Sequence, residues 1–385
     1  MDRFDTIVVG AGPAGCLAAC RLAARGASVA LVDGSHPREK PCGGGVTMRA
    51  LDLVRQSVDL PAVPRVAIES ATFEHRGRAA RVALRPTAAT PALAIVARRD
   101  FDGALLGAAV SAGARPLRSH VQDVRPDGSG WIVATRNGDI RGDWLLGADG
   151  PGSLVRRRVS RPFDRADLSI AAGCYVRGAT SASIDIAFTD DPPGYLWAFP
   201  RPDHLAVGIC AQADITTSGV LLAAARRWIA AHVEDRDAGI TQYSWPIPSL
   251  GEAALRRERH AGPGWMLLGD AAGLVDPITR EGIYYALQSA EAAARSLGAA
   301  DPAARYTTEL RATVIEELLR SARFKARFFR PAFMGLFVSA LQRSGRIREV
   351  AADLISGQQT FRHLRRRLLA TLEWGLMVEL FALRQ

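Results

Sequence analysis

The sequence is poor in lysine and contains no long apolar run. Lys40 and Lys325 are its only lysines, so arginine carries nearly all of the positive charge. No stretch of about 18 consecutive apolar residues is present, and we therefore expect no transmembrane helix. Asp2, Arg3 and Asp5 precede a short apolar run that ends in glycines, which argues against a secretory signal peptide.

Cysteine is scarce, and its spacing excludes two kinds of site. No two cysteines form a CxxC pair, and no cysteine–histidine cluster has the spacing of a metal site, so we expect no metal. Without a secretory signal, disulfides are not expected either. Cys16 and Cys20 lie one turn apart on a predicted helix, where small apolar packing residues are expected. The seven histidines accompany no serine or cysteine motif.

The charge balance is strongly basic, with a net charge of +10. Two explanations stay open: the arginine-rich codon usage of a GC-rich genome, or attraction to phosphates or an anionic membrane surface. The sequence contains no recognised nucleic-acid module, and few aromatic residues interrupt the basic runs. We therefore expect no binding to nucleic acid.

A nucleotide-binding pattern opens the chain. Residues 4–10 form an apolar run of strand length, residues 14–25 predict a helix of small residues, and residues 28–33 predict a second strand. A glycine-rich turn, GAGPAG, joins the first strand to the helix. The strand, turn, helix and second strand together predict a βαβ unit, and the alternative is a tight turn in some other α/β fold.

The glycines of this turn have separate roles. Gly10 permits the tight turn, Gly12 lets the backbone approach a pyrophosphate, and Gly15 lets helix and strand pack closely. The helix that begins at Ala14 directs free N–H groups and a positive dipole end toward the pyrophosphate. Asp33 ends the second strand, where it is placed to hydrogen-bond ribose hydroxyls.

Two later motifs distinguish FAD from NAD. Residues 146–150 read LGADG, and residues 268–277 read LGDAAGLVDP, with Glu281, Gly282 and Ile283 close behind. With the first glycine turn, these motifs resemble the para-hydroxybenzoate hydroxylase superfamily of flavoproteins, roughly from the N-terminus to residue 300.

This resemblance implies a set of FAD contacts. Asp270 is expected to hydrogen-bond the ribityl chain, and Gly282 is expected to open a helix whose N-terminus faces the flavin. A helix N-terminus has a physical use there, because reduced flavin carries negative charge. The residues that match the superfamily's cofactor positions are Arg98, Asp149, Gly150, Gly269, Asp270, Pro277, Gly282 and Ile283. In the superfamily, the Asp149–Gly150 motif is associated with both FAD and NAD(P)H.

The pattern of elements predicts an α/β fold, because parallel α/β pieces alternate with antiparallel strands and the chain is too long for one typical core. We expect a glutathione-reductase-type, Rossmann-like FAD-binding domain made of residues 1–62, 92–160 and 260–300. An antiparallel β-sheet substrate domain, residues 63–91 and 161–259, is inserted into it. Residues 301–385 are expected to form a helical C-terminal region.

Two further motifs resemble the geranylgeranyl reductase family, whose members hydrogenate isoprenoid double bonds. Residues 41–45 read PCGGG, and residues 195–200 read YLWAFP, with Gly208 following. In that family the first motif lies near the flavin and the second lines the substrate cavity. A flavin-dependent halogenase would instead show a WxWxIP signature and a lysine between flavin and substrate, so halogenation is not expected.

Tyr195, Trp197 and Phe199 alternate along one strand, so all three should lie on one face. Beside a flavin, such a face suits a long hydrocarbon ligand, and the alternative is plain sheet core. Cys42 is either a packing thiol or one that orients substrate or donates a proton to the reduced alkene. Tyr195 and water are the other candidate proton donors.

Arg280 departs from the family pattern, in which a small or polar residue precedes Glu281 and Gly282. Its cation would either form a salt bridge with Glu281 or Asp276, or lie near the flavin and stabilise the reduced anion.

The C-terminal region combines clustered arginines with aromatic residues such as Phe324, Phe328 and Phe337. A basic helix with an aromatic face suits peripheral contact with a membrane, and the alternative is a helical cap over the substrate cavity. We therefore expect a cytoplasmic protein, at the inner face of the membrane if the first interpretation holds.

These features predict an FAD-dependent reductase of carbon–carbon double bonds in an isoprenoid compound. No second GxGxxG unit is present, which predicts a transient electron donor, either NAD(P)H or a reduced ferredoxin as partner protein. Two alternatives stay open: an aromatic or polyketide monooxygenase on the same fold, and a dehydrogenase that passes electrons to a quinone.

Overall fold

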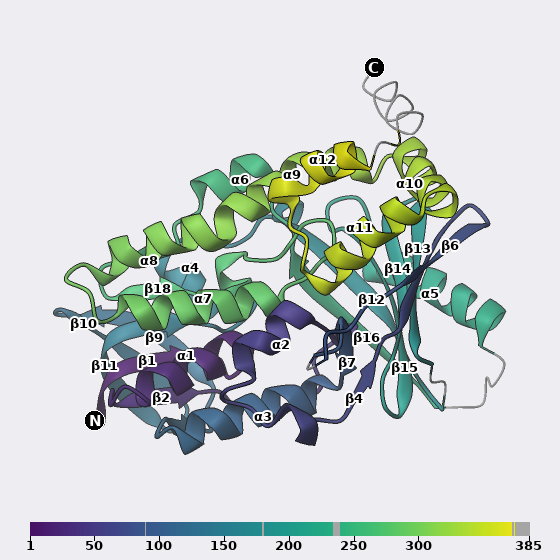
Figure 1. Cartoon of the computed structure of the whole chain (residues 1–385). Coiled ribbons are helices and arrows are strands. Elements are labelled where there is room, and N and C mark those ends of the chain that lie inside the picture. Colours follow the sequence, from purple (N-terminus) through teal and green to yellow (C-terminus); the bar gives the residue numbers. More distant parts are fainter. Residues whose placement is uncertain (89, 179–180, 234–238, 372, 374–385) are drawn as a thin grey trace.

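The computed structural model describes residues 1–88, 90–178, 181–233, 239–371 and 373 (Figure 1). The glycine turn follows strand β1 of an eight-stranded sheet. Its parallel part runs in the order β8-β2-β1-β11-β18, with β17 paired antiparallel beyond β18 and the β9–β10 hairpin beside β11. These strands are β1 (Arg3–Val9), β2 (Val29–Val32), β8 (Arg115–Leu117), β9 (Val121–Asp127), β10 (Gly130–Thr135), β11 (Gly138–Gly147), β17 (Ala261–Gly262) and β18 (Trp265–Leu267).

Helices cover this sheet. The small residues of α1 (Pro13–Ala23) let it pack closely between α3 (Arg98–Ser111) and α7 (Ile283–Ser296). Cys16 and Cys20 are buried there, as packing residues would be. Shorter helices connect the parts: α2 (Met48–Val54), α4 (Leu154–Val159) and α6 (Glu252–Arg257).

A second, seven-stranded sheet has the order β16-β12-β15-β14-β13-β5-β6. Its strands are β5 (Ser70–His75), β6 (Arg78–Ala83), β12 (Leu168–Arg177), β13 (Ser183–Asp190), β14 (Pro193–Pro200), β15 (His204–Gln212) and β16 (Ile240–Pro248). All neighbouring pairs are antiparallel except β5 and β13, which are parallel. The predicted sheet is thus almost wholly antiparallel, and its one parallel pair joins the two separate chain segments that build it.

A three-stranded sheet has the order β3-β7-β4 and consists of β3 (Gly45–Thr47), β7 (Leu93–Val96) and β4 (Arg65–Ala67). The helix α5 (Ser218–His232) packs on the seven-stranded sheet against β12 and β15. The predicted α/β fold is confirmed, with a nucleotide-type domain around the parallel strands, a second sheet and a helical C-terminal part.

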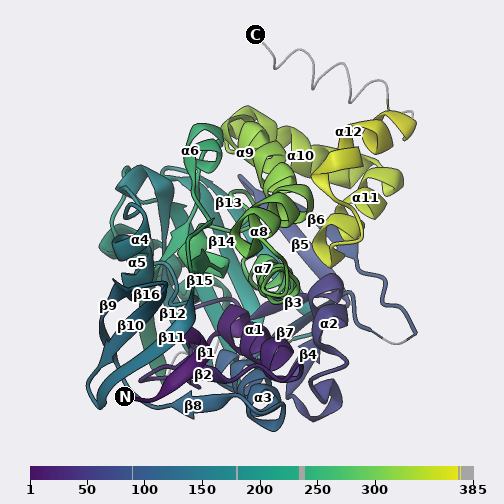
Figure 2. The same cartoon turned by 90° about the vertical axis from the view of Figure 1, so that its left-hand side faces the viewer.

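The helical part comprises α8 (Pro302–Leu310), a π-helical turn at Arg311–Ile315, α9 (Glu316–Phe328), α10 (Pro331–Arg343), α11 (Gly345–Ser356) and α12 (Phe361–Ala370). Among the described residues, no helix is long and apolar enough to cross a membrane. Figures 1 and 2 both show α9, α10, α11 and α12 gathered on the side of the molecule away from α1 and β2. Of the predicted helical region, residues 372 and 374–385 lie outside the described part of the chain.

The alternation along β14 separates two hydrophobic clusters. Tyr195 and Trp197 belong to a cluster that includes residues of α10 and α11, with Phe199 packed against it. Leu196 and Ala198, on the other face, belong to a cluster shared with α5. The period of two therefore directs all three aromatic side chains to the face covered by the C-terminal helices.

Lys325 ties α9 to the edge of the seven-stranded sheet. Its ammonium donates to Gln212 Oε1 at 2.7 Å, to Ser249 Oγ at 2.8 Å and to the Ser249 carbonyl at 3.0 Å. These acceptors are neutral. Burial, and then the nearby charge of Arg280, lower the pKa of Lys325 to about 7.

This shift predicts a pH-dependent stability. Between about pH 7 and 10 the unfolded chain holds a proton on Lys325 that the folded chain lacks, so stability should rise with pH. The unfolding free energy of the wild type minus that of Lys325→Met should therefore rise by up to about 1.4 kcal/mol per pH unit over that range. Denaturant unfolding at several pH values measures it. A difference that stays flat with pH would contradict the low pKa.

Candidate active site

A cavity of about 230 Å³ lies at the carboxyl end of β1, between the glycine turn and β2. It is lined by many of the predicted cofactor residues, namely Gly10, Gly12, Ala14, Asp33, Arg98, Asp149, Gly150 and Asp270. A Cβ added at Gly12 would meet only His36, at 3.9 Å, so this glycine leaves its side open. That open backbone before a helix N-terminus fits a pyrophosphate, as in FAD.

The other glycines of the turn are constrained by the protein itself. Gly10 has φ +103°, and a Cβ there would lie 2.4 Å from the Ala148 carbonyl oxygen. A Cβ at Gly15 would lie 1.8 Å from the Gly10 carbonyl oxygen. Gly15 lines neither cavity, so its role is the close packing of helix on strand.

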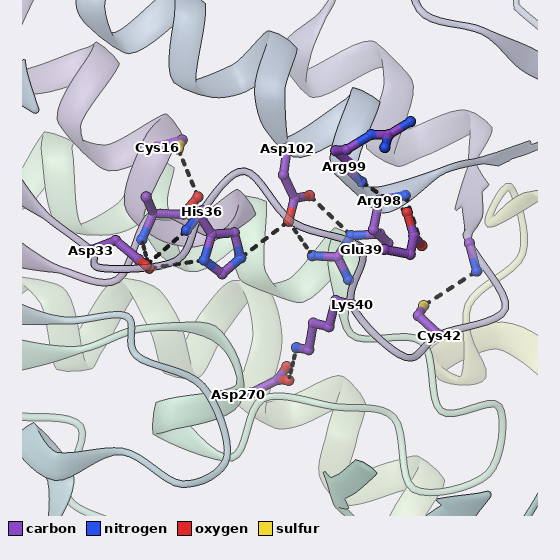
Figure 3. Close-up of polar contacts among 12 residues, drawn as sticks. Cys16, Asp33, His36, Glu39, Lys40, Cys42, Arg98, Arg99, Asp102 and Asp270 are labelled. Atoms are coloured by element: carbon purple, nitrogen blue, oxygen red, sulfur yellow. Dashed lines mark hydrogen bonds and ion pairs between the residues drawn. The ribbon is translucent and has the colours of Figure 1, made fainter. Parts of the chain in front are cut away.

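A partly buried polar network surrounds Asp33 (Figure 3). Asp33 accepts from the Ala11 N–H at 2.9 Å and contacts His36 Nδ1 at 2.9 Å. Burial alone would raise the pKa of Asp33, but the hydrogen bonds from His36 and Ala11 outweigh it and hold the pKa well below its usual range. The carboxylate is therefore an ionised acceptor, as recognition of ribose hydroxyls requires.

The same network reaches Arg98. His36 Nε2 lies 3.5 Å from the Asp102 carboxylate, an ion-pair distance longer than a hydrogen bond. Arg98 donates to both oxygens of Asp102, at 2.9 and 2.7 Å, and both residues are buried. Burial opposes ionisation of Asp102, but the charge of Arg98 lowers the pKa of this carboxyl. Arg98 thus lines the site as a fixed, paired cation.

Asp149 and Asp270 are both engaged by the protein. Asp149 accepts from the Ser153 hydroxyl at 2.5 Å and from the Leu154 N–H at 2.7 Å, and so caps α4 while lining the cavity. Asp270 accepts from Lys40 Nζ at 2.9 Å, and both residues line this cavity and the larger one beside it. This ion pair, drawn in Figure 3, therefore lies where the two cavities share lining residues.

The larger cavity has a volume of about 800 Å³. It runs from Pro13, Asp270, Gly282 and Ile283, past the loop 41–45, to the helices α9 to α12. Tyr195, Trp197 and Phe199 all line it, together with Phe73 and Phe188 and with phenylalanines of α9 and α10. The structure therefore brings the predicted substrate residues and the predicted flavin-side residues to one continuous space.

Besides Gly15, two predicted cofactor residues do not face either cavity. Gly269, at φ +55°, packs between Ala14 and Ala286 and lines neither cavity. Pro277 also lines neither, and its carbonyl accepts from Arg280 Nη1.

The loop 39–44 is held against the second sheet by Arg201. This guanidinium is fully buried and donates to the Cys42 carbonyl at 2.6 Å and to the Glu39 carboxylate. Glu39 also accepts the N–H groups of Arg98 and Arg99, at 3.3 and 3.2 Å, in the first turn of α3. Gly43 packs directly against Phe199, because a Cβ at this position would lie 2.6 Å from the Phe199 ring.

Cys42 and Tyr195, the predicted catalytic residues, both line the large cavity. The Cys42 sulfur accepts from the Gly44 N–H at 3.3 Å, which leaves its own proton free to donate. The Tyr195 hydroxyl donates to the Thr279 carbonyl at 2.7 Å, and burial raises its pKa well above the usual value. Its proton is therefore already committed to the backbone.

Arg280 adopts φ +60°, a left-handed conformation that costs a residue other than glycine about 1–3 kcal/mol. Within the described residues it forms neither of the predicted salt bridges. Glu281 is engaged instead by Arg49 and by Thr47, whose Oγ1 donates to it at 2.8 Å. Its guanidinium instead lies 5.8 Å from the centre of the Phe329 ring.

Sequence reasoning missed several residues of the site. His36 and Asp102 carry the network that orders Asp33 and Arg98, and Arg201 and Glu39 hold the Cys42 loop. Asp102 follows Arg98 by four residues on a predicted helix, and this spacing could have marked it as a partner of that arginine. His36, Glu39 and Arg201 have no spacing that marks them.

The comparisons with known proteins agree with this geometry. Residues 3–305 match the FAD binding domain family. A menaquinone reductase of Mycobacterium tuberculosis is 31% identical over 331 residues, covering 78% of each chain. A geranylgeranyl diphosphate reductase of Rhodobacter capsulatus is 30% identical over 322 residues, also 78% of each.

Among solved structures, a geranylgeranyl bacteriochlorophyll reductase-like protein from Thermoplasma acidophilum has the same fold. The TM-score is 0.78 at 22% identity, over 96% of this chain and 99% of that one. The protein is thus an FAD-dependent oxidoreductase. Within the FAD-binding-domain flavoproteins, it belongs to the geranylgeranyl reductase family.

Two glycine variants should separate cofactor binding from folding. Gly12→Ala places a methyl group on an open side, so the apoprotein should keep its melting temperature while FAD affinity falls by about tenfold or more. Gly15→Ala should lower both the melting temperature and the FAD affinity, because its Cβ clashes with the Gly10 carbonyl. Flavin absorbance after gel filtration and thermal unfolding measure the two effects. Gly152→Ala, at an open loop position, is the control. Full FAD affinity in Gly12→Ala would show that the pyrophosphate lies elsewhere.

Proposed function

We propose that this enzyme hydrogenates carbon–carbon double bonds of an isoprenoid compound. The observation that carries the proposal is the continuous cavity, whose walls are mainly aromatic and aliphatic from the second sheet to α12 and which reaches the residues predicted to hold FAD. The named substrates of the two curated relatives, menaquinone and geranylgeranyl diphosphate, share a prenyl chain. A largely apolar space of about 800 Å³ suits such a chain better than a small polar ring.

Different residues of the chain would bind the hydrocarbon and donate the proton. Bound FAD, once reduced, supplies a hydride to one alkene carbon. Tyr195, Trp197 and Phe199 would hold the hydrocarbon and exclude water from it. The second alkene carbon needs a proton, and we assign this donation to Cys42 because its S–H is free whereas the Tyr195 O–H is engaged.

The position of Cys42 supports this assignment. Arg201 donates to the Cys42 carbonyl at 2.6 Å, so the thiol is carried by a backbone that is fixed to the second sheet. After the thiol has given its proton to the alkene carbon, water can restore it.

We propose that electrons reach FAD from NAD(P)H or a reduced ferredoxin. The protein would work at the inner face of the membrane, where prenyl lipids lie. The basic, partly exposed helices that border the cavity support that location, because positive charge is attracted to anionic lipid heads.

The reaction is tested by mass spectrometry. The enzyme is reduced with dithionite under anaerobic conditions and mixed with geranylgeranyl diphosphate or a prenylated quinone. Each reduced double bond should add about 2 Da, the mass of a hydride and a proton. No gain without oxygen, followed by a gain of about 16 Da once oxygen is admitted, would instead identify a monooxygenase on the same fold.

The proton donor is tested in the same assay by single-turnover rates. Cys42→Ala should slow product formation by about 10²–10⁴-fold, the usual contribution of general acid catalysis, and Cys42→Ser should recover part of it. Tyr195→Phe, which keeps the ring, should change the rate only a few fold. FAD content of each variant is the control. An equal loss in Tyr195→Phe would transfer the role to that residue.

A further inference from the structure

The large cavity has a basic end. Four arginines of the C-terminal helices line it, and we call them the arginine rim: Arg320, Arg327, Arg330 and Arg365. The first two lie on α9, the third precedes α10, and the fourth lies on α12, which packs against α9. Arg327, Arg330 and Arg365 are exposed, so this end of the cavity meets solvent.

Most of the rim lacks a counter-charge. Across the part of the chain that the structure describes, the side chains of Arg327, Arg330 and Arg365 have no hydrogen-bond or ion-pair partner. Arg320 donates to the Glu316 carbonyl at 2.9 Å and lies 3.8 Å from the Glu317 carboxylate.

The acids that line this end are already engaged. Burial raises the pKa of Glu317, whose carboxyl accepts from the Phe361 N–H. Glu373 accepts from the Ser344 hydroxyl at 2.5 Å. Among the described residues, neither acid forms an ion pair with Arg327, Arg330 or Arg365, so these three guanidinium groups stay available to an anionic ligand.

The walls next to the rim are apolar. Phe324 and Phe328 of α9, Phe333 and Phe337 of α10, and Leu364 and Leu368 of α12 line the cavity between the rim and the second sheet. Figures 1 and 2 place α9 and α12 on the side of the molecule away from α1 and β2, where the nucleotide cavity lies. The space is thus cationic at its solvent end, apolar along its walls, and bounded at the other end by the predicted flavin residues.

We propose that the arginine rim binds the phosphate group of a prenyl substrate whose hydrocarbon chain fills the cavity toward the FAD. Guanidinium groups pair with phosphate oxygens through two parallel hydrogen bonds, which an uncharged quinone cannot match. The proposal rests on the proposed function and narrows its substrate class to phosphate-bearing prenyl compounds. That chemistry is shared by a soluble prenyl diphosphate and by a prenylated phospholipid in a membrane.

The test measures binding to the oxidised, FAD-loaded enzyme, so it does not depend on turnover. The probes are geranylgeranyl diphosphate below its micelle-forming concentration and geranylgeraniol, which has the same chain without charge. Changes in flavin absorbance report the affinity. The rim variant is Arg327→Ala/Arg330→Ala. The control is Arg362→Ala/Arg366→Ala, which removes two exposed arginines of α12 that do not line the cavity.

The wild type should bind the diphosphate at least about tenfold more tightly than the alcohol, and the rim variant should lose that advantage while the control keeps it. Sedimentation with phosphatidylcholine vesicles, with and without a prenylated phospholipid, identifies the source. Capture of the enzyme only by vesicles that contain the prenylated phospholipid points to a lipid head group as the phosphate source. Tight binding of the soluble diphosphate points to a free prenyl diphosphate.

Equal affinity for diphosphate and alcohol, or equal losses in both double variants, would overturn the assignment. The first result would show that the chain alone is recognised, and the second that the basic surface acts only through its overall charge. Either result leaves the double-bond reduction intact, since the anaerobic mass gain tests that reaction separately.

Discussion

The pairing of the buried Arg201 guanidinium controls how the two halves of the active site meet. A buried guanidinium must keep its partners, because an unpaired charge in the interior is strongly destabilising. Arg201, at the end of β14, finds its partners in the loop 39–44, through the Cys42 carbonyl and the Glu39 carboxylate. The strand that carries the aromatic face is thereby fixed to the loop that carries the thiol.

The same contact extends into the nucleotide domain. Glu39 accepts the first N–H groups of α3, and α3 carries Arg98 and Asp102, which order His36 and Asp33. Gly44 completes the junction, because at φ +85° any Cβ would lie 2.3 Å from the Val96 carbonyl oxygen. Cofactor residues and substrate residues are therefore parts of one polar framework.

Much of this architecture could be predicted from sequence, and the reason is local. The glycine turn, the LGADG and LGDAAGLVD motifs and the alternation of Tyr195, Trp197 and Phe199 each record a constraint that acts within a few residues. Their placement along two cavities follows from period and spacing. The roles of Cys42 and Tyr195 as catalytic groups stay predictions, although their hydrogen bonds now distinguish them.

The parts that sequence could not give depend on residues far apart along the chain. Lys40 meets Asp270 across 230 positions, and Arg201 meets Glu39 across 162. Arg280 is the reverse case: sequence marked it as a departure, but its left-handed backbone and its turn toward Phe329 emerge only in three dimensions. Single charges carry no period, so only the folded structure shows their partners.

The order of these parts along the chain has an evolutionary consequence. Every residue predicted to hold FAD lies before α8, whereas the helices α9 to α12 enclose the far part of the large cavity. Mutations and insertions in the last quarter of the gene can therefore change which substrates the enzyme accepts, while the residues predicted to bind FAD stay under separate selection. A lineage built this way can acquire new metabolites by altering one end of its coding sequence.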